Sequence, residues 1–176
     1  MSQAVDVVEC APRMLAAARG AVSGPRDVPT VLIRLLDSVY AFLKDHPSVR
    51  QTGQNVAVYG RAHGWMEAGV EIGRPFESDD GTIVCTTTPA GRAATAVHRG
   101  PYIEMSAAHS AVHEFCHQRG FQLAGPSWEI YGLGGGPRSA PLAWKASTLP
   151  AFATPSCLWS GRHDSNVHEP SDSTAL

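Results

Sequence analysis

The chain repeats one order of predicted elements, and this repeat limits the folds that it can adopt. When the two halves are aligned at an offset of about 72 to 77 residues, Pro12 falls on Pro89. Within the same range of offsets, Tyr59 falls on Tyr131. The identities are few, but the order of predicted elements agrees along the alignment. We therefore interpret the chain as two tandem copies of one module.

Each half contains strand-like and helical segments in the same order. In the first half the segments are strand-like residues 5–22, a helix over 29–47, and strands over 55–60 and 64–73. In the second half they are strand-like residues 82–100, a helix over 104–120, and a strand over 126–132. Apolar residues at a spacing of three to four indicate the helices, and short apolar runs bounded by turn residues indicate the strands. The order predicts an α+β fold with tandem duplicated β-α-β-β modules, one antiparallel sheet and two helices on one face.

Composition and charge fit a single globular domain. At 176 residues and 43% hydrophobic content, the chain can bury one substantial core. A formal net charge of -2 gives no electrostatic reason to bind nucleic acid or an anionic membrane. The start of the chain lacks the basic region and apolar core of a signal peptide, and no run approaches about 18 apolar residues, so we expect a cytoplasmic protein. Four cysteines without a C-x-x-C pair are expected to be reduced thiols.

Residues 113–117 of the second predicted helix read H-E-F-C-H, which matches the zinc-protease signature H-E-x-x-H. Two histidines four apart on a helix can chelate a metal, but zinc needs a third protein ligand. The longer motif places that histidine three residues after Gly120, where this chain has Leu123. In the aligned first half, the two histidine positions hold a tyrosine and a lysine. We therefore interpret the segment as a solvated helix flank, with His109 at the edge of the apolar stripe, and expect no metal and no cofactor.

Alternation along the predicted strands places aromatic and acidic residues on one face of the sheet. Met66, Val56 and Val58 are expected to pack under the helices. The opposite face then carries Tyr59, Trp65, Glu67, Glu129 and Tyr131. Such a face suits a flat, cationic molecule, because rings supply apolar area and cation–π attraction while an acid supplies the counter-charge. A plain solvated sheet face is the alternative, although Glu129 aligns with Ala57, so the scaffold does not require an acid there.

The second half also contains three motifs in a defined order. They are TTTPAGRAATAVHRGPY at 86–102, Gly-Phe at 120–121 after the predicted helix, and PSWEIY at 126–131. Together they resemble the GyrI-like domain, which is the effector-binding domain of AraC-type and multidrug-responsive transcription regulators. The resemblance covers roughly residues 4–132. It implies two tandem β-α-β-β modules around a ligand cleft, in agreement with the duplication.

The resemblance also implies roles for individual residues. Glu129 corresponds to the acidic residue that family members direct at cationic, aromatic ligands, and aromatic residues are expected to line the cleft around it. The residues expected to bind the ligand are Glu129, Tyr131, Tyr59, Trp65, Tyr102 and Glu67. His98 is expected beside the cleft, in a structural hydrogen-bonding role rather than in catalysis.

We expect a stand-alone bacterial member of this family, because no DNA-binding segment precedes the domain. Our first hypothesis is a protein that senses or sequesters small cationic or aromatic molecules, as a monomer or weak dimer that contacts neither nucleic acid nor membrane. An alternative is a hydrolase of reactive cyclopropane-containing molecules, in which Glu129 positions water and Tyr131 assists. A second alternative is a modulator of a partner enzyme such as DNA gyrase.

The chain departs from the family pattern after residue 132. We expect a GyrI-like domain over 1–132 and an atypical Gly/Pro/Ser-rich tail over 133–176, either disordered or frameshifted. The counterpart of the predicted strand at 64–73 should lie near 137–150, and we expect it to be missing. A frameshift or read-through near residue 133 is one hypothesis, which resequencing of the locus tests. The alternative is a natural flexible tail with apolar anchors at Trp144, Phe152 and Trp159.

Overall fold

The structure is a computed structural model that describes residues 4–60, 64–78, 80–99, 104–132 and 141–149. The first half contains β1 (Val5–Cys10), β2 (Met14–Ala21), α1 (Val28–Asp45), β3 (Gln51–Tyr59) and β4 (Trp65–Ile72). The second half contains β5 (Val84–Thr87), β6 (Gly91–Arg99), α2 (Met105–Gln118), β7 (Gln122–Tyr131) and β8 (Pro141–Leu149). The order is the same in both halves, so each copy is a β-β-α-β-β module. The predicted α+β class with one antiparallel sheet and two helices is confirmed.

The strand order of the sheet is a mirror image about its centre. In the described residues the order is β1-β6-β8-β7-β3-β4-β2-β5, and each strand has its counterpart from the other module at the same distance from the middle. The modules exchange their edge strands, because β1 pairs with β6 of the second module and β5 pairs with β2 of the first. At the centre, Ala57 of β3 lies directly opposite Glu129 of β7. The repeat mates therefore become cross-strand neighbours.

Each helix is amphipathic and buries one stripe. In α1 the buried residues are Leu32, Leu35 and Val39, and proline near the N-terminus suits the first helical turn. In α2 the buried residues are Met105, Ala108, Val112 and Cys116. This helix ends where Gly120 adopts a positive φ of 66° and Phe121 donates its backbone N–H to the Cys116 carbonyl.

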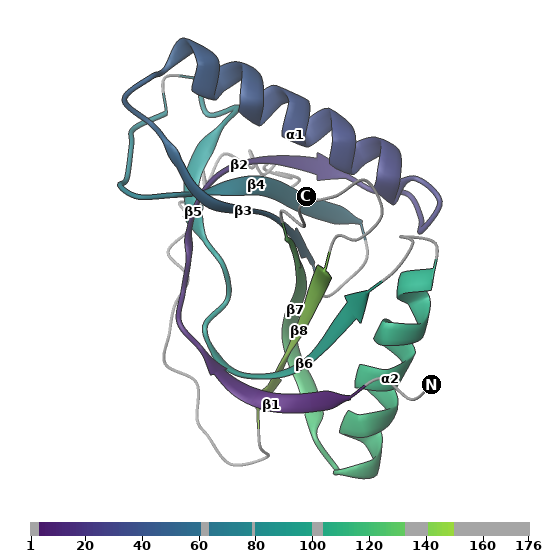
Figure 1. Cartoon of the computed structure of the whole chain (residues 1–176). Helices are drawn as coiled ribbons and strands as arrows, with labels where there is room; N and C mark the ends of the chain where they lie inside the picture. The colour runs from purple at the N-terminus through teal and green to yellow at the C-terminus, as the bar shows by residue number, and fades with distance from the viewer. Residues whose placement is uncertain (1–3, 61–63, 79, 100–103, 133–140, 150–176) are drawn as a thin grey trace, which may run out of the picture.

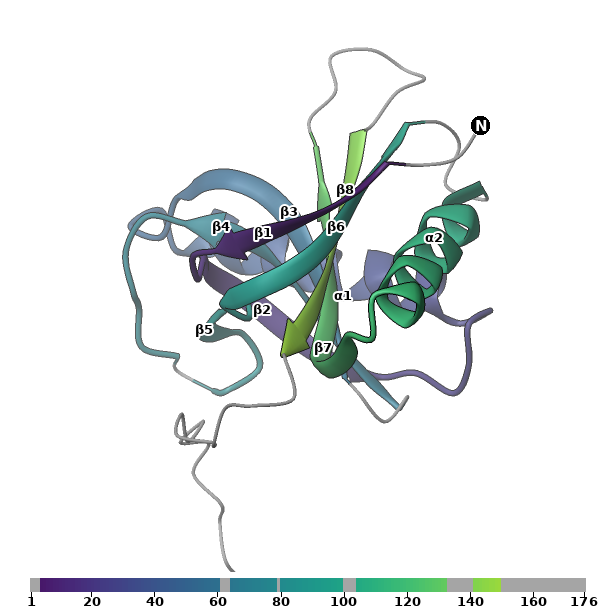
Figure 2. The ribbon, with the colours of Figure 1, turned by 90° about the horizontal axis from the view of Figure 1, so that it is seen from below.

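Both helices pack on the outer face of a strongly curved sheet (Figure 1). α1 covers β2 and β4, whereas α2 covers β6 together with parts of β1, β7 and β8. Seen from below, α2 lies beside β6 and β8 on the outside of the curl (Figure 2). This arrangement leaves the central strands β3 and β7 between the two helices.

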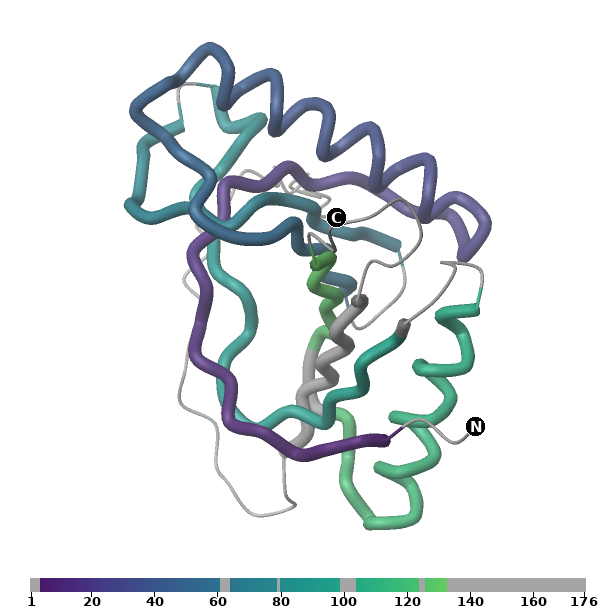
Figure 3. The backbone as a smooth tube through the Cα atoms, in the orientation of Figure 1, coloured from purple at the N-terminus to yellow at the C-terminus, as the bar shows by residue number. Residues whose placement is uncertain are grey.

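The inner face of the curl is buried as well. Its apolar cluster consists of Cys10, Leu15, Ala17, Val56, Val58, Ala93, Trp128 and Ile130. The trace of β1 and β2, purple in Figure 3, runs along the side of the curl opposite β7. Because residues on both faces of β3 are buried, hydrophobicity alone does not tell which face lies under the helices.

The predicted orientation of β3 is wrong for this reason. Val56 and Val58 belong to the inner cluster, not to the face under the helices. Ala57 and Tyr59 instead pack with the cluster that includes Met66 and the buried stripe of α1. The two valines are the more apolar residues, but here they fill the interior of the curl, while the smaller alanine lies beneath the helix.

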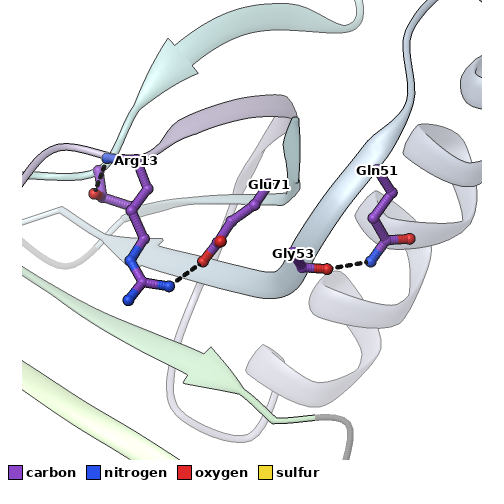
Figure 4. Close-up of polar contacts among 5 residues, drawn as sticks. Arg13, Gln51, Gly53 and Glu71 are labelled. Carbon is purple, nitrogen blue, oxygen red and sulfur yellow. Dashed lines mark hydrogen bonds and ion pairs between the residues drawn. The ribbon is translucent and has the colours of Figure 1, made fainter. Parts of the chain in front are cut away.

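An ion pair joins Arg13, the residue before β2, to β4 beside an irregular stretch of β3 (Figure 4). Arg13 donates from Nη1 to Glu71 Oε1 over 2.5 Å, and Gln51 donates from Nε2 to the Gly53 carbonyl over 2.8 Å. The β3–β4 register shifts between Gln51 and Asn55. A Cβ atom at Gly53 would lie 2.1 Å from Glu71 Oε2, so a glycine lets the ion pair approach the strand.

The expectation of a missing fourth strand in the second module is wrong. β8 occupies this position and pairs with both β6 and β7. The division of the chain at residue 132 stays a prediction, as does the frameshift hypothesis. The proposed anchors Phe152 and Trp159 lie outside the described residues, and Trp144 takes a register position opposite Ala96 and Glu129. In the parts of the chain that the structure describes, neither helix is long and apolar enough to cross a membrane.

Candidate functional site

Three of the predicted site residues meet between the two helices, on the outer face of the sheet. Glu129 and Tyr131 are neighbours on one face of β7, and Tyr59 comes from the adjacent strand β3. Tyr131 packs against the apolar clusters under both α1 and α2, so the site lies where the two modules meet. Glu129 is only 1% exposed, and both tyrosines are partly buried.

The Glu129 carboxylate is the centre of a hydrogen-bond network. Tyr59 donates its hydroxyl to Oε2 over 2.9 Å, and Tyr131 donates to the same oxygen over 2.5 Å. The two hydroxyl oxygens are 3.4 Å apart. On the other side of the carboxylate, Nε2 of His109 lies 3.3 Å from Oε1 and forms an ion pair when the imidazole is protonated. We call Glu129, Tyr131, Tyr59 and His109 the Glu129 cluster.

His109 was not among the residues predicted to bind a ligand. It lies on α2 at the edge of the buried stripe, one turn after Met105 and one turn before Val112. The sequence pattern already placed His109 at that edge, and a residue at the edge of a helix stripe faces the sheet obliquely. The sequence does not indicate, however, that the acid on β7 lies next to this histidine in the folded protein.

Burial sets the protonation state of one member of the cluster. Desolvation raises the pKa of the Tyr131 hydroxyl well above its ordinary value of 10.0, and the neighbouring Glu129 carboxylate raises it further. Tyr131 therefore remains a hydrogen-bond donor at alkaline pH as well as at neutral pH. A buried carboxylate is costly unless it is compensated. The phenols supply part of this compensation, and a cation near the carboxylate would supply more.

At alkaline pH, the free energy of unfolding is expected to fall because Tyr131 resists deprotonation in the folded protein. The pKa is raised on folding, so the stability is fully present below the unfolded value of 10.0 and is lost above it. The loss is about 1.4 kcal/mol for each pH unit above that value. Urea unfolding of wild type and Tyr131→Phe between about pH 8 and 11 measures this slope, which should be shallower in the variant. Equal slopes in the two proteins would contradict the assignment.

Two other predicted residues, Trp65 and Glu67, lie on the inner face and not in the Glu129 cluster. Glu67 Oε2 accepts a hydrogen bond from Arg19 Nη2 over 2.9 Å, and the Arg19 guanidinium lies 4.8 Å from the Trp65 ring centroid. The predicted common face is therefore split in two. The cause is the reversed orientation of both β3 and β7. Tyr59, Glu129 and Tyr131 were predicted on the face away from the helices, but they lie on the face that the helices cover, whereas Trp128 and Ile130 point into the inner cluster.

Other sequence predictions concern residues that are not members of the Glu129 cluster. Tyr102 lies outside the described residues. His98 is buried on β6, on the same side as Ala94 and Ala96 under α2, and its hydrogen-bonding role stays a prediction. His113 and His117 are exposed on α2, and within the described segments no group of three or more potential metal ligands occurs.

A surface cavity of about 730 Å³ lies at the β5 edge of the sheet, away from the central strands β3 and β7. Its lining includes Arg19 from β2, Thr82 before β5, and the residues of β5 itself. No member of the Glu129 cluster lines this cavity. The cavity and the Glu129 cluster are therefore separate features of the molecule.

Comparison with known proteins identifies the fold. No family model and no curated protein sequence matches this chain. The C-terminal domain of EcmrR matches with a TM-score of 0.71 at 16% identity, over 85% of this chain and 99% of that chain. SAV2435 bound to tetraphenylphosphonium matches with a TM-score of 0.55 at 12% identity, over 83% and 94% of the two chains. A hydrolase from Listeria innocua matches with a TM-score of 0.53 at 12% identity, over 84% and 93%.

These similarities establish a shared architecture. They agree with the α+β fold of two modules in one antiparallel sheet that the sequence predicts. At identities of 10–17% they concern the fold alone. Function must therefore be argued from the residues of the Glu129 cluster.

Proposed function

We propose that the protein binds small cationic, aromatic molecules at the Glu129 cluster and thereby senses or sequesters them. The observation that carries the proposal is a carboxylate that is 1% exposed between two partly buried tyrosines, at the meeting point of the modules. The pairing of one central acid with aromatic rings fits a ligand that brings both positive charge and flat apolar area.

The hydrogen bonds in the cluster hold the acid in a defined orientation. Both phenol hydroxyls donate to Oε2, so their rings stand beside the carboxylate. A cation near Glu129 gains a charge–charge attraction that burial strengthens, because water screens it less. Contacts with the tyrosine rings add about 0.5–2 kcal/mol each. The net free energy is smaller, since the ligand also loses its hydration and its freedom of motion.

The comparisons support the ligand class. SAV2435, which has the same type of fold, is a protein whose structure contains bound tetraphenylphosphonium, a permanent aromatic cation. That ligand is a suitable probe for this chain, because its charge cannot be removed by a change of pH. Tetraphenylborate has nearly the same shape and the opposite charge, so it separates charge recognition from hydrophobic binding.

Replacing Glu129 by glutamine is expected to weaken tetraphenylphosphonium binding by about tenfold to a hundredfold, the size typical of a lost partly buried charge contact. Calorimetric titration of the two proteins measures the change. Wild type is expected to bind the phosphonium ion and to reject the borate ion. The variant keeps the shape of the side chain, so the difference reports the charge.

Glu67→Gln is the matched control. Glu67 is also buried and acidic, but it lies on the inner face and pairs with Arg19. This variant should bind tetraphenylphosphonium as tightly as wild type does. Equal weakening by both substitutions, or equal binding of the borate and phosphonium ions, would mean that Glu129 does not recognise charge.

Hydrolysis is the second candidate, supported by the contact between a carboxylate and a protonated phenol. Glu129 could position water while Tyr131 donates a proton to a leaving group, as the two oxygens are 2.5 Å apart. The Listeria innocua hydrolase shares the fold. Mass analysis after incubation with cyclopropane-containing electrophiles distinguishes the two functions, because a binder returns the compound unchanged. Modulation of a partner such as DNA gyrase, a cytoplasmic location and a monomeric or weakly dimeric state stay predictions.

A further inference from the structure

We propose that His109 is a proton-dependent counter-ion for Glu129, which a cationic ligand displaces, so that ligand binding releases a proton. The proposal rests on the proposed function, because it requires a cation to bind at Glu129. It assigns to His109 a positioning role that sets the pH range and the charge preference of the site.

The two carboxylate oxygens have different partners. Both tyrosine hydroxyls donate to Oε2, whereas Oε1 faces Nε2 of His109 at 3.3 Å. The His109 side chain is 37% exposed and the Glu129 side chain 2%. The imidazole is therefore the more solvent-accessible partner of the pair. A cation that approaches Oε1 must either share this space with the imidazole or push it aside.

The repeat shows that the scaffold does not need a histidine at this position. With Val39 aligned on Val112 and Phe42 on Phe115, His109 corresponds to Leu36 of α1. Leu36 is partly buried and belongs to the same apolar cluster as Ala57, the repeat mate of Glu129. One module thus has a leucine and an alanine where the other has a histidine and a glutamate.

This paired difference points to a joint role. A leucine would pack under α2 as its counterpart packs under α1, and it would leave the carboxylate without this partner. A histidine can neutralise the carboxylate when protonated and can release it when neutral, because its charge ordinarily changes between about pH 5 and 8. Neither a lysine nor an arginine would respond in this range.

Other titratable groups lie around His109 and Glu129, and their contributions to a pH dependence must be distinguished from that of this pair. On the α2 side of the described strands these are Glu129 and Tyr131 of β7, Tyr59 of β3, His98 and Arg92 of β6, and Glu9 of β1. On α2 itself, His113 follows one turn later and is exposed. In β8 the register positions opposite Glu129 and Tyr131 hold Trp144 and Leu142, neither of which titrates. The histidines are the groups whose charge ordinarily changes between about pH 5 and 8.

The direction of the effect follows from charge. At low pH the imidazolium balances Glu129, and a cation must compete with it and also meet its like charge. At higher pH the imidazole is neutral and no longer competes with the ligand for the negative charge of the carboxylate. Affinity for a permanent cation should therefore rise with pH and level off once His109 is neutral. By linkage, binding at low pH expels up to one proton.

Titration of the full chain with tetraphenylphosphonium at about pH 5.5, 6.5, 7.5 and 8.5 tests the proposal. For wild type, affinity should rise roughly tenfold over this range, and calorimetry in two buffers of different ionisation enthalpy should detect a released proton at the lower values. In His109→Gln, the affinity for tetraphenylphosphonium should not change with pH, and binding should release no proton. His113→Gln, which changes an exposed histidine one turn away, should keep the wild-type profile.

His109→Leu provides a second test that guards against misfolding. It introduces the residue that the first module already holds at this position, so thermal melting should show a folded protein. Its affinity for tetraphenylphosphonium should also not change with pH. If His109→Gln and His109→Leu retain the wild-type pH dependence while Glu129→Gln weakens binding, the role of His109 is overturned and the proposed function stands. If wild type fails to bind tetraphenylphosphonium at every pH, both proposals fall.

Discussion

Replacement of Trp128 by alanine is expected to lower the free energy of unfolding by about 3–5 kcal/mol. Trp128 lies on β7, is 1% exposed and is among the largest fully buried side chains of the described residues. Its ring fills the inside of the curl beside Val58 and Ile130. Removing it leaves a cavity that β strands on several sides cannot close without breaking their ladders. Since small domains have only about 5–15 kcal/mol of stability, this loss is a large share.

Urea unfolding followed by circular dichroism measures the loss, because tryptophan fluorescence changes with the substitution itself. Trp128→Phe should give an intermediate value and remains measurable if the alanine variant does not fold. Trp65→Ala is the control, since that ring is 39% exposed and its loss should cost far less. A similar loss in Trp65→Ala and Trp128→Ala would show that the inner cluster is not the core of the fold.

Replacement of Gly69 by alanine is expected to cost about 3 kcal/mol, the upper end of the range for overpacking. Gly69 lies on β4 directly opposite Ala17 of β2. An added Cβ would lie 2.3 Å from the Ala16 carbonyl oxygen and 2.7 Å from the Ala17 Cβ. The nearest atom belongs to the backbone of the neighbouring strand, so relief requires the two strands to move apart rather than a side chain to rotate.

Gly24→Ala is the matched control for this substitution. Nothing lies within 4 Å of a Cβ built at Gly24, so the same chemical change should leave stability nearly unaltered or raise it slightly. Thermal melting of the two variants beside wild type gives the comparison. A small effect at Gly69 would mean that β2 and β4 approach less closely than the structure places them.

The architecture was largely predictable because it is encoded by local patterns that occur twice. Helical spacing identified both helices, and Pro12 and Pro89 marked the breaks between β1 and β2 and between β5 and β6. β8 was missed because its sequence, PLAWKASTL, mixes small, polar and charged residues without a β-branched run. Its strand conformation is supported by pairing on both edges, with β6 and β7, and such long-range pairing leaves little trace in the local sequence.

The site was predictable in part. Glu129, Tyr131 and Tyr59 were grouped from strand alternation and from the resemblance, and the structure places them in hydrogen-bond contact. Their role in ligand binding stays a prediction. Trp65 and Glu67 were grouped with them because period-two alternation defines two faces of a strand without saying which one a helix covers.

The mirrored strand order bears on how such a site can arise in evolution. In a homodimer of one module, the position of Ala57 and Glu129 would occur twice, face to face across a twofold axis. An acid there would bring two like charges onto one cross-strand pair, which is destabilising. Once both modules are encoded in a single gene, a mutation can change one copy and spare the other. In a symmetric ancestor, an acid at this position would be present in both copies or in neither. Gene fusion thus permits an acid in one copy alone.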